Sequence, residues 1–335
     1  MRLFEVYPRF EIEITKGSGS YVWDSKGNRY LDFYGGHAVI SIGHAHPHWM
    51  HRIQKQMENM PFYSNSVQIP IQHELAKKLT SLSGYAEYRL FLCNSGAEAN
   101  ENALKLASAH NKQREIIAFR HGFHGRTSLA VAVTDNPNII FPVNEVDFVH
   151  RLELGDLELA EQLMETGKIS SVIVEGIQGI GGVHEPGAEY LKKIRKLCSD
   201  NGSLLILDEI QSGFGRSGSF FAHQNSEVKA DIITMAKGMG NGFPVGGMLV
   251  KPGIEAKFGM LGSTFGGNQM ACAATLAVLE VLHEEQLMKN SIEIGDFLME
   301  ELRKIPEIAE VRGRGLMIGL QFGFPVKVLR KNLLF

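Results

Sequence analysis

Two apolar segments of the chain each end in one ionisable side chain, and the two charges are opposite. Leu-Leu-Ile-Leu at 204–207 is followed by Asp208, and Ile-Ile-Thr-Met-Ala at 232–236 is followed by Lys237. Both segments are typical of buried strands, so they carry a carboxylate and an amine to strand ends. A buried lysine can hold an aldehyde as a Schiff base, and a buried aspartate can keep a pyridine nitrogen protonated. The pair therefore suits the chemistry of pyridoxal 5′-phosphate (PLP).

Two nucleotide-binding readings compete with this one. Asp208 and Glu209 after an apolar strand also match the Walker B pattern of nucleotide hydrolases, but the sequence contains no Walker A loop of the form G-x-x-x-x-G-K-[ST]. The glycines of 238–242 resemble a dinucleotide loop. That segment follows Lys237 and opens no predicted helix, so we interpret it as flexible backbone around the lysine.

The histidines at His44, His46 and His48 suggest a metal site. No Cys, Asp or Glu lies in the local segment to complete one, and the sequence has no H-E-x-x-H motif. Pro47 favours a helix start, so we interpret these histidines as helix-capping residues and predict no metal.

Length and composition predict a soluble cytoplasmic enzyme of two packed lobes. The chain has 335 residues, of which 44% are hydrophobic, and exceeds the usual size of a single core. The net charge of −3 does not indicate binding to nucleic acid or to an anionic membrane, both of which attract strongly basic proteins. Cys93, Cys198 and Cys272 are an odd number in unrelated contexts, which favours reduced thiols. We find no signal-peptide core and no apolar stretch near the ~18–20 residues of a membrane span.

The elements that must position these groups follow from periodicity. A turn composition at 25–28 predicts a β-hairpin of 21–24 with 29–33. Further on, apolar runs alternate with helical patterns, which implies an α/β fold whose mainly parallel sheet is covered by helices on both faces. Predicted strands are 89–93, 116–119, 171–175, 204–207, 232–236, 245–250 and two within 309–322. Predicted helices are 47–60, 72–82, 97–109, 188–201, 270–283 and 287–304.

We expect three sections of chain: 1–60 as the N-terminal part of a small domain, 61–268 as a large α/β cofactor domain, and 269–335 as the C-terminal part of the small domain. The N-terminal hairpin is expected to pack with the C-terminal segment.

Ligands of α/β sheets bind beyond the carboxyl ends of the strands. Ser95, Gly96 and Ala97 join the strand at 89–93 to a helix, so the free amides of the first turn could face a phosphate. An ordinary capped helix is the alternative.

Two more strand ends carry candidates. Phe123, between glycines, could stack on a flat heterocycle, and Arg126 could grip a carboxylate. The alternative is a core phenylalanine and a solvated arginine. Glu175 and Gln178 could hydrogen-bond a ring substituent or guide substrate, or they could be polar residues of a turn.

Together these segments resemble the class III (ornithine-type) aminotransferases of the fold type I PLP enzymes. The resemblance runs from about Tyr7 to Gln321, and its first segments look closest to the acylornithine aminotransferases of arginine biosynthesis. It implies a seven-stranded, mainly parallel sheet with a small α+β lobe. The matching segments, in family order, are 35–39 with 43–47, 94–101, 122–127, 207–218, 236–238 and 262–268.

The resemblance also implies roles. Lys237, its pKa depressed by burial beside the cationic cofactor, would hold PLP and shuttle the proton, and Asp208 would pair with the pyridinium nitrogen. Arg126, Glu175 and Ser263 would contact substrate, Arg126 through a carboxylate. Ser95, Gly96 and Ala97 would bind the phosphate, and Thr264 from the other subunit of a homodimer would complete that phosphate site. Phe123 would stack on the ring face, and Gln211 would bind the ring hydroxyl. Glu209 and Ile210 would be further cofactor-binding residues.

Two departures from the family carry expectations of their own. Many relatives have Gln-Gly-Glu where this chain has Gln178-Gly179-Ile180, and that Glu screens a second substrate-binding arginine during the half-reaction with an ω-amino donor. We hypothesise that the donor here brings its own carboxylate to that arginine, as an Nα-acylated ornithine would. The family also usually continues with a stretch containing the arginine for the α-carboxylate, and Lys327, Arg330 and Lys331 lack its context. We expect cofactor binding to survive and catalysis to be impaired or lost.

The leading function is PLP-dependent transfer of the terminal amino group of an N-acylated ornithine, acetyl or succinyl, to 2-oxoglutarate, giving acyl-glutamate semialdehyde and glutamate. Alternatives are another ω-amino donor such as ornithine, 4-aminobutyrate or a diamine, an aminomutase, and a PLP-binding or dimerisation partner without turnover. No nucleic-acid or membrane partner is expected.

Overall fold

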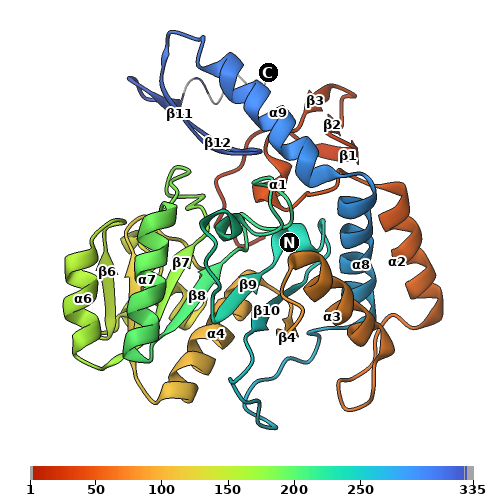
Figure 1. The fold of residues 1–335 in the computed structure, drawn as a ribbon. Coiled ribbons are helices and arrows are strands. Elements are labelled where there is room, and N and C mark those ends of the chain that lie inside the picture. Colours follow the sequence, from red (N-terminus) through yellow and green to blue (C-terminus); the bar gives the residue numbers. More distant parts are fainter. Residues whose placement is uncertain (1–2, 328, 330–335) are drawn as a thin grey trace.

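The computed structural model describes residues 3–327 and 329; Arg330 and Lys331 of the sequence analysis lie outside the described residues. Its centre is one seven-stranded sheet (Figure 1). In spatial order the strands are β4 (Arg89–Cys93), β10 (Gly246–Val250), β9 (Ile232–Met235), β8 (Leu204–Asp208), β7 (Ile169–Glu175), β5 (Glu115–Phe119) and β6 (Val149–Leu152).

The sheet is parallel from β9 to β6, and only β10 among its strands is antiparallel to its neighbours β9 and β4. The mainly parallel seven-stranded sheet predicted from the sequence is therefore confirmed. Because β4 runs with the parallel strands, the carboxyl ends of β4, β5, β7, β8 and β9 meet at one edge, while β10 brings its amino end there.

Helices cover both faces of this sheet (Figure 1). The described helices are α1 (Gly35–Ala38), α2 (Pro47–Asn59), α3 (Pro70–Ser83), α4 (Gly96–Asn111), α5 (Ser128–Ala132), α6 (Leu157–Glu165), α7 (Ala188–Asn201), α8 (Gln269–Glu284) and α9 (Leu287–Leu302). The predicted helices are all found, and α7 has the predicted bounds. None of the helices within the described residues is long and apolar enough to cross a membrane.

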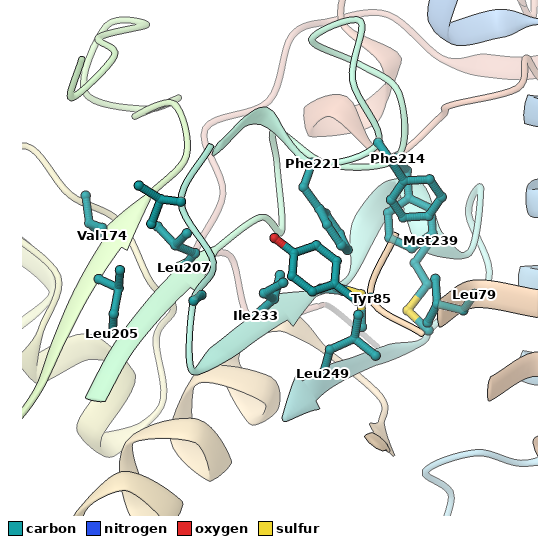
Figure 2. Close-up of a cluster of buried hydrophobic side chains, with 14 of the residues drawn as sticks. Leu79, Tyr85, Val174, Leu205, Leu207, Phe214, Phe221, Ile233, Met239 and Leu249 are labelled. Atoms are coloured by element: carbon teal, nitrogen blue, oxygen red, sulfur yellow. The ribbon is translucent and has the colours of Figure 1, made fainter. Parts of the chain in front are cut away.

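Side chains along β8 alternate between the two faces of the sheet, and each face carries its own buried hydrophobic cluster. Leu204 and Ile206 pack into a buried cluster with Leu104 of α4, whereas Leu205 and Leu207 pack into the cluster on the opposite face. Each such side chain contributes about 1.5–3 kcal/mol when removed from water. In Figure 2 residues from β7, β8, β9 and β10 line this second cluster, with labelled partners from elsewhere in the chain: Leu79, Tyr85, Phe214, Phe221 and Met239.

Two small sheets lie at the top of the view in Figure 1. β1 (Ile14–Ser18), β2 (Tyr21–Asp24) and β3 (Arg29–Leu31) form an antiparallel sheet, which confirms the predicted hairpin and adds one strand. β11 (Ile308–Arg314) and β12 (Met317–Phe322) pair with each other, as predicted. The N-terminal hairpin thus takes its hydrogen-bonding partner from β1, and the two small sheets are separate.

A buried carboxylate joins α2, α3 and α8. Glu280 of α8 accepts hydrogen bonds from His48 (2.6 Å) and from Lys78 (2.7 Å), and it also pairs with Arg52. Burial alone would raise the pKa of Glu280, but hydrogen bonds from Arg52, Lys78 and His48 outweigh it and lower the pKa to about 2.

We expect Glu280→Gln to lower the free energy of unfolding by roughly 1–3 kcal/mol at pH 7, because three cationic or donor partners lose their charge-assisted acceptor. A carboxyl whose folded pKa is depressed stabilises the protein above its unfolded pKa, near 4.5. The difference between wild type and variant should therefore stay constant down to about pH 5 and shrink between pH 4.5 and about 2. Urea unfolding at several pH values measures it.

The matched control is Glu300→Gln, which removes an exposed carboxylate 3.7 Å from Lys304. Such surface pairs contribute about 0–1 kcal/mol. Equal losses of unfolding free energy in the two variants, or a Glu280→Gln effect that does not change with pH, would contradict the role of Glu280 in joining α2, α3 and α8.

The three histidines that suggested a metal have protein partners. His46 caps α2 by accepting from the His48 amide at 3.3 Å, as predicted. His44 pairs with Asp32 at 2.7 Å, and His48 pairs with Glu280. The described residues contain no group of three or more side chains that could hold a metal ion.

Candidate active site

Three neighbouring strand ends bring the predicted catalytic groups to one place. Glu175 of β7 is in register with Asp208 of β8, and Asp208 is in register with Thr234 of β9. All three side chains are buried. Lys237 lies two residues after the end of β9, so the carboxylate and the amine predicted from the sequence lie at adjoining strand ends.

Lys237 begins a single 3₁₀ turn, Lys237–Met239, with a backbone φ of 47°. A left-handed conformation is unusual for a residue with a side chain, and such strain concentrates at functional sites. The half-buried amine has no hydrogen-bond partner among the described residues. Burial lowers the pKa of Lys237 and the charge of Arg216 lowers it further, while Asp208 and Glu175 oppose the shift. The amine therefore loses its proton more readily than an ordinary lysine.

The glycines beside the lysine lie where the packing leaves little room for a side chain. A Cβ on Gly240 would collide with the Phe243 carbonyl oxygen, and Gly238 lies against Phe214 and Ser41. The Ser41 hydroxyl donates to the Gly238 carbonyl at 2.7 Å.

The segment before α2 closes the lysine turn from the other side. The Ser41 amide donates to Asn241 Oδ1 at 2.9 Å, across 200 positions of sequence. Arg216 donates to the carbonyls of Ala38 and Ile40 at 3.0 and 2.9 Å. The N-terminal segment, the loop after β8 and the lysine turn are thereby tied together.

The amino end of α4 points backbone amides toward the strand ends. Ser95 caps the helix by accepting from the Glu98 amide at 3.2 Å. Since the first turn of a helix has no internal acceptors for its amides, those of Gly96 and Ala97 are free for an anion. A Cβ on Gly96 would stand 2.8 Å from the Ile210 side chain, so the glycine lets the loop after β8 pack over this turn.

The loop after β5 closes on the same turn. Gly125, with a φ of 139°, lies so close to Ala97 that a Cβ would be 2.8 Å from that side chain. The Phe123 amide donates to Glu175 Oε1 at 2.9 Å, and the Gly179 amide donates to Glu175 Oε2 at 3.1 Å. Burial raises the pKa of Glu175 to about 7, with Asp208 adding to the shift and His124 opposing it. The structure thus gathers Ala97, Phe123 and Glu175 around the strand ends.

Asp208 sits in a buried hydrogen-bond network. Its Oδ2 accepts from Asn100 Nδ2 and from His124 Nδ1, each at 2.8 Å, and its Oδ1 accepts from the Ile210 amide at 3.0 Å. Thr234 donates to Asn100 Oδ1 at 2.7 Å. Burial would lower the pKa of His124, but its hydrogen bond to Asp208 and the charges of Asp208 and Glu175 raise it. Asp208 is therefore held in one orientation by donors on two sides.

The side chain of Glu209, a predicted cofactor-binding residue, lies in a hydrogen-bond network of its own. It is fully buried, and its two oxygens accept from the Ser212 hydroxyl, from the Ala222 amide, and from both the amide and the ring of His223. His223 in turn contacts the Tyr85 hydroxyl at 2.5 Å. The carboxylate anchors the loop that follows β8.

The remaining predicted residues differ in how far they are exposed. Arg126 is exposed and has no charged partner among the described residues. Ser263 Oγ accepts from Asn94 Nδ2 at 2.9 Å, which places its loop beside the β4–α4 turn. Thr264 is exposed, and Gln211 lies against Gly179 at a half-buried position. Gln178 is buried and donates to the Arg120 carbonyl at 2.8 Å.

The residues present fit a cofactor with an aldehyde, an aromatic nitrogen and a phosphate. The unpaired amine of Lys237 could form a Schiff base with the aldehyde, and the Asp208 carboxylate could pair with the protonated ring nitrogen. The free amides at Gly96 and Ala97 could bind the phosphate, next to the Ile210 side chain that packs against Gly96. His124 Nε2 is buried without a hydrogen-bond partner among the described residues.

Sequence analysis missed Asn100, His124 and Thr234 as site residues. Asn100 and His124 lie inside segments quoted for the resemblance, but no local pattern assigns them a partner. Their hydrogen bonds join positions that are 24, 84, 108 and 134 residues apart.

Comparison with known proteins agrees with this geometry. The sequence model of the class III aminotransferase family matches residues 5–332. Acetylornithine aminotransferase of Nitrosomonas europaea is 40% identical over 98% of this chain and 86% of its own length. Acetylornithine aminotransferase of Bacillus subtilis is 40% identical over 97% of this chain and 85% of its own length.

Solved structures are similar as well. Ornithine aminotransferase from Toxoplasma gondii, with partial occupancy of PLP at its active site, superposes with a TM-score of 0.90 at 30% identity, covering 96% of this chain and 79% of its own. Taurine:2-oxoglutarate aminotransferase from Bifidobacterium kashiwanohense, in complex with PLP and glutamate, has a TM-score of 0.90 at 27% identity over 99% of this chain and 85% of its own.

Proposed function

The chain belongs to the class III aminotransferases, and from this premise we propose that it transfers the terminal amino group of an N-acylated ornithine to 2-oxoglutarate. It is a PLP-dependent aminotransferase with the α/β fold of those enzymes. The observation that carries the proposal is the pair of Lys237 and Asp208 at adjoining strand ends in a chain 40% identical to acetylornithine aminotransferases.

When bound, PLP supplies a carbonyl that takes up the amino group and a ring that withdraws electrons from the reacting carbon. Lys237 would hold that carbonyl through Nζ, and its amine, when free, would carry the proton from the donor's terminal carbon. A depressed pKa suits this use, because the amine must be free of its proton near neutral pH.

Asp208, held by Asn100 and His124, would pair with the ring nitrogen. Ser95, Gly96 and Ala97 would hold the phosphate, next to Ile210, which packs against Gly96. Phe123 would stack on the ring, and Gln211 would bind the ring hydroxyl. Such fixed contacts orient the cofactor before substrate arrives, which is the main contribution a protein makes to cofactor chemistry.

Substrate recognition is assigned to the exposed side of the site. Arg126 binds a substrate carboxylate with its unpaired guanidinium, which suits a bidentate contact. Ser263 and Glu175 complete the substrate side. The products are an acyl-glutamate semialdehyde and glutamate, in a step of arginine biosynthesis.

The test is turnover by the purified protein with 2-oxoglutarate and each of N-acetylornithine, N-succinylornithine and free ornithine. We expect the highest kcat/KM with an acylated donor, and with the acetyl form if the chain shares the preference named for its relatives. Preference for free ornithine, 4-aminobutyrate or a diamine would replace the acylornithine proposal. If the absorption spectrum of the PLP-loaded protein did not change on addition of any donor, the chain would be a PLP-binding protein without turnover.

Ile180 tests the donor preference directly. It is 62% exposed in a loop between glycines, so a carboxylate placed there would be solvated. Free ornithine keeps an α-ammonium that acylation removes. We expect Ile180→Glu to raise kcat/KM for free ornithine roughly two- to fivefold, the range of an exposed ion pair, and to leave the value for N-acetylornithine unchanged.

Ile180→Gln is the matched control, since it adds polarity without charge and should change neither value. An improvement with both donors after Ile180→Glu would refute the idea that the donor supplies its own carboxylate.

The assembly proposed is a cytoplasmic homodimer with shared sites. Cys93, Cys198 and Cys272 are free and buried, which suits a reducing compartment. Thr264 is exposed next to Phe265, whose ring is 59% exposed and contacts Phe62. An apolar surface beside Thr264 supports a subunit contact that would carry this hydroxyl to a partner's phosphate site.

A further inference from the structure

Asn100 makes three buried hydrogen bonds with its one side-chain amide. Nδ2 donates to Asp208 Oδ2 at 2.8 Å and to the His124 carbonyl at 2.8 Å, while Oδ1 accepts from the Thr234 hydroxyl at 2.7 Å. None of the four residues is more than 3% exposed. The amide has no partner in solvent, so these contacts alone decide its orientation.

The chemistry of the partners permits only this orientation. The Asp208 carboxylate and the His124 carbonyl oxygen are acceptors, so they require the NH₂ end of the amide. A flipped amide would place its oxygen against both, and it would leave the Thr234 hydroxyl facing a donor. A buried polar group without a partner costs about 1–3 kcal/mol, which keeps the amide fixed.

Asn100 also links the two ends of the cofactor site. It lies on α4, one turn after the free amides of Gly96 and Ala97, and it faces the sheet where Asp208 and Thr234 are neighbours in register. Helix α4 therefore sets the distance between the phosphate cradle and the carboxylate for the ring nitrogen.

We infer that Asn100 is a positioning residue: oriented by Thr234, its amide fixes the Asp208 carboxylate and the His124 backbone as one unit. The inference rests on the proposed function only for the identity of the group that Asp208 faces. Asn100 touches no reacting atom, and it acts through Asp208.

Two variants test the inference, and two controls accompany the second of them. Asn100→Leu removes the amide at similar volume, and Thr234→Val removes only the hydroxyl that orients it. Thr234→Ser keeps that hydroxyl and should restore the wild-type values. Thr275→Val is the matched control for a lost buried threonine hydroxyl, since Thr275 is fully buried in α8 and donates to the Ala271 carbonyl at 2.9 Å, away from the site.

Three readouts are measured on the full-length protein. In the cofactor-free form, nitrogen NMR of the His124 ring, assigned by comparison with His124→Gln, reports the Asp208–His124 contact. Equilibrium dialysis gives the dissociation constant of PLP, and steady-state kinetics separates kcat from KM. For Asn100→Leu we expect a changed His124 ring signal, roughly tenfold weaker PLP binding, and kcat lower by about tenfold or more with KM for 2-oxoglutarate unchanged. Thr234→Val should shift each readout in the same direction by a smaller amount.

A fall in thermal stability alone, with the His124 signal and PLP affinity as in wild type, would overturn the inference and leave Asn100 a packing residue. Equal effects of Thr275→Val would overturn it too. The proposed function fails separately, if wild type does not transaminate any acylornithine while the NMR and PLP readouts still respond to Asn100→Leu.

Discussion

Lys237→Arg is expected to lower kcat for transamination by roughly 10²–10⁴-fold or more, since arginine keeps the positive charge but neither holds the cofactor carbonyl nor serves as a proton carrier near neutral pH. Burial and Arg216 already bias the Lys237 amine toward its neutral form, and arginine has no comparable neutral form. Steady-state rates of glutamate formation from N-acetylornithine and 2-oxoglutarate measure the loss.

A second measurement on the same proteins locates the bond. Borohydride reduction of the PLP-loaded wild type followed by peptide mass mapping should place the label on Lys237, and Lys237→Arg should carry none. Lys257→Arg, a change at an exposed lysine, is the control and should keep both the label and the rate. A label on any other lysine of the wild type would remove the basis of the assignment.

Asp208→Asn is expected to reduce kcat by roughly 10²–10³-fold, the usual loss when a buried group that stabilises charge is removed. An amide cannot neutralise a protonated ring nitrogen, and it cannot accept from both Asn100 and His124 with the strength of a carboxylate. Because burial alone lowers the pKa of His124, loss of the Asp208 charge should also bring that pKa down. Steady-state kinetics and His124 NMR measure the two effects.

Asp231→Asn is the matched control for a lost buried carboxylate. Asp231 is as buried as Asp208, but it pairs with Arg195 and Lys251 and accepts from the Leu205 amide, near the opposite end of β8. This variant should lose stability and keep kcat. If Asp208→Asn behaved in the same way, with kcat intact, the carboxylate would have a structural role only.

The sequence predicted the architecture well where apolar runs are continuous. The β8 strand is buried on both faces, so its four apolar residues and the Asp208 that ends it stand out without an alignment. The helix 188–201 was predicted to its bounds because Gly202 ends it in a left-handed conformation. By contrast, Val149–Leu152 mixes His and Arg into an edge strand, and its composition gives no strand signal.

Within the site, the sequence predicted residues next to strand ends and missed those that reach the site from elsewhere. Lys237 and Asp208 follow apolar runs directly. Asn100 and Thr234 sit inside a helix and a strand, where a polar residue has no local reason to be functional. Glu209 neighbours Asp208 in sequence, but successive residues at a strand end point to opposite sides, and the carboxylate of Glu209 faces His223.

The contacts between Ser41 and the lysine turn have a consequence for the geometry of that turn. Ser41 binds Gly238 and Asn241 across 197 and 200 positions of sequence, and closing contacts of such separation costs more chain entropy than closing local ones. The left-handed turn at Lys237 is therefore supported by a segment from the far end of the chain. Its geometry depends on the docking of that N-terminal segment as well as on the sheet.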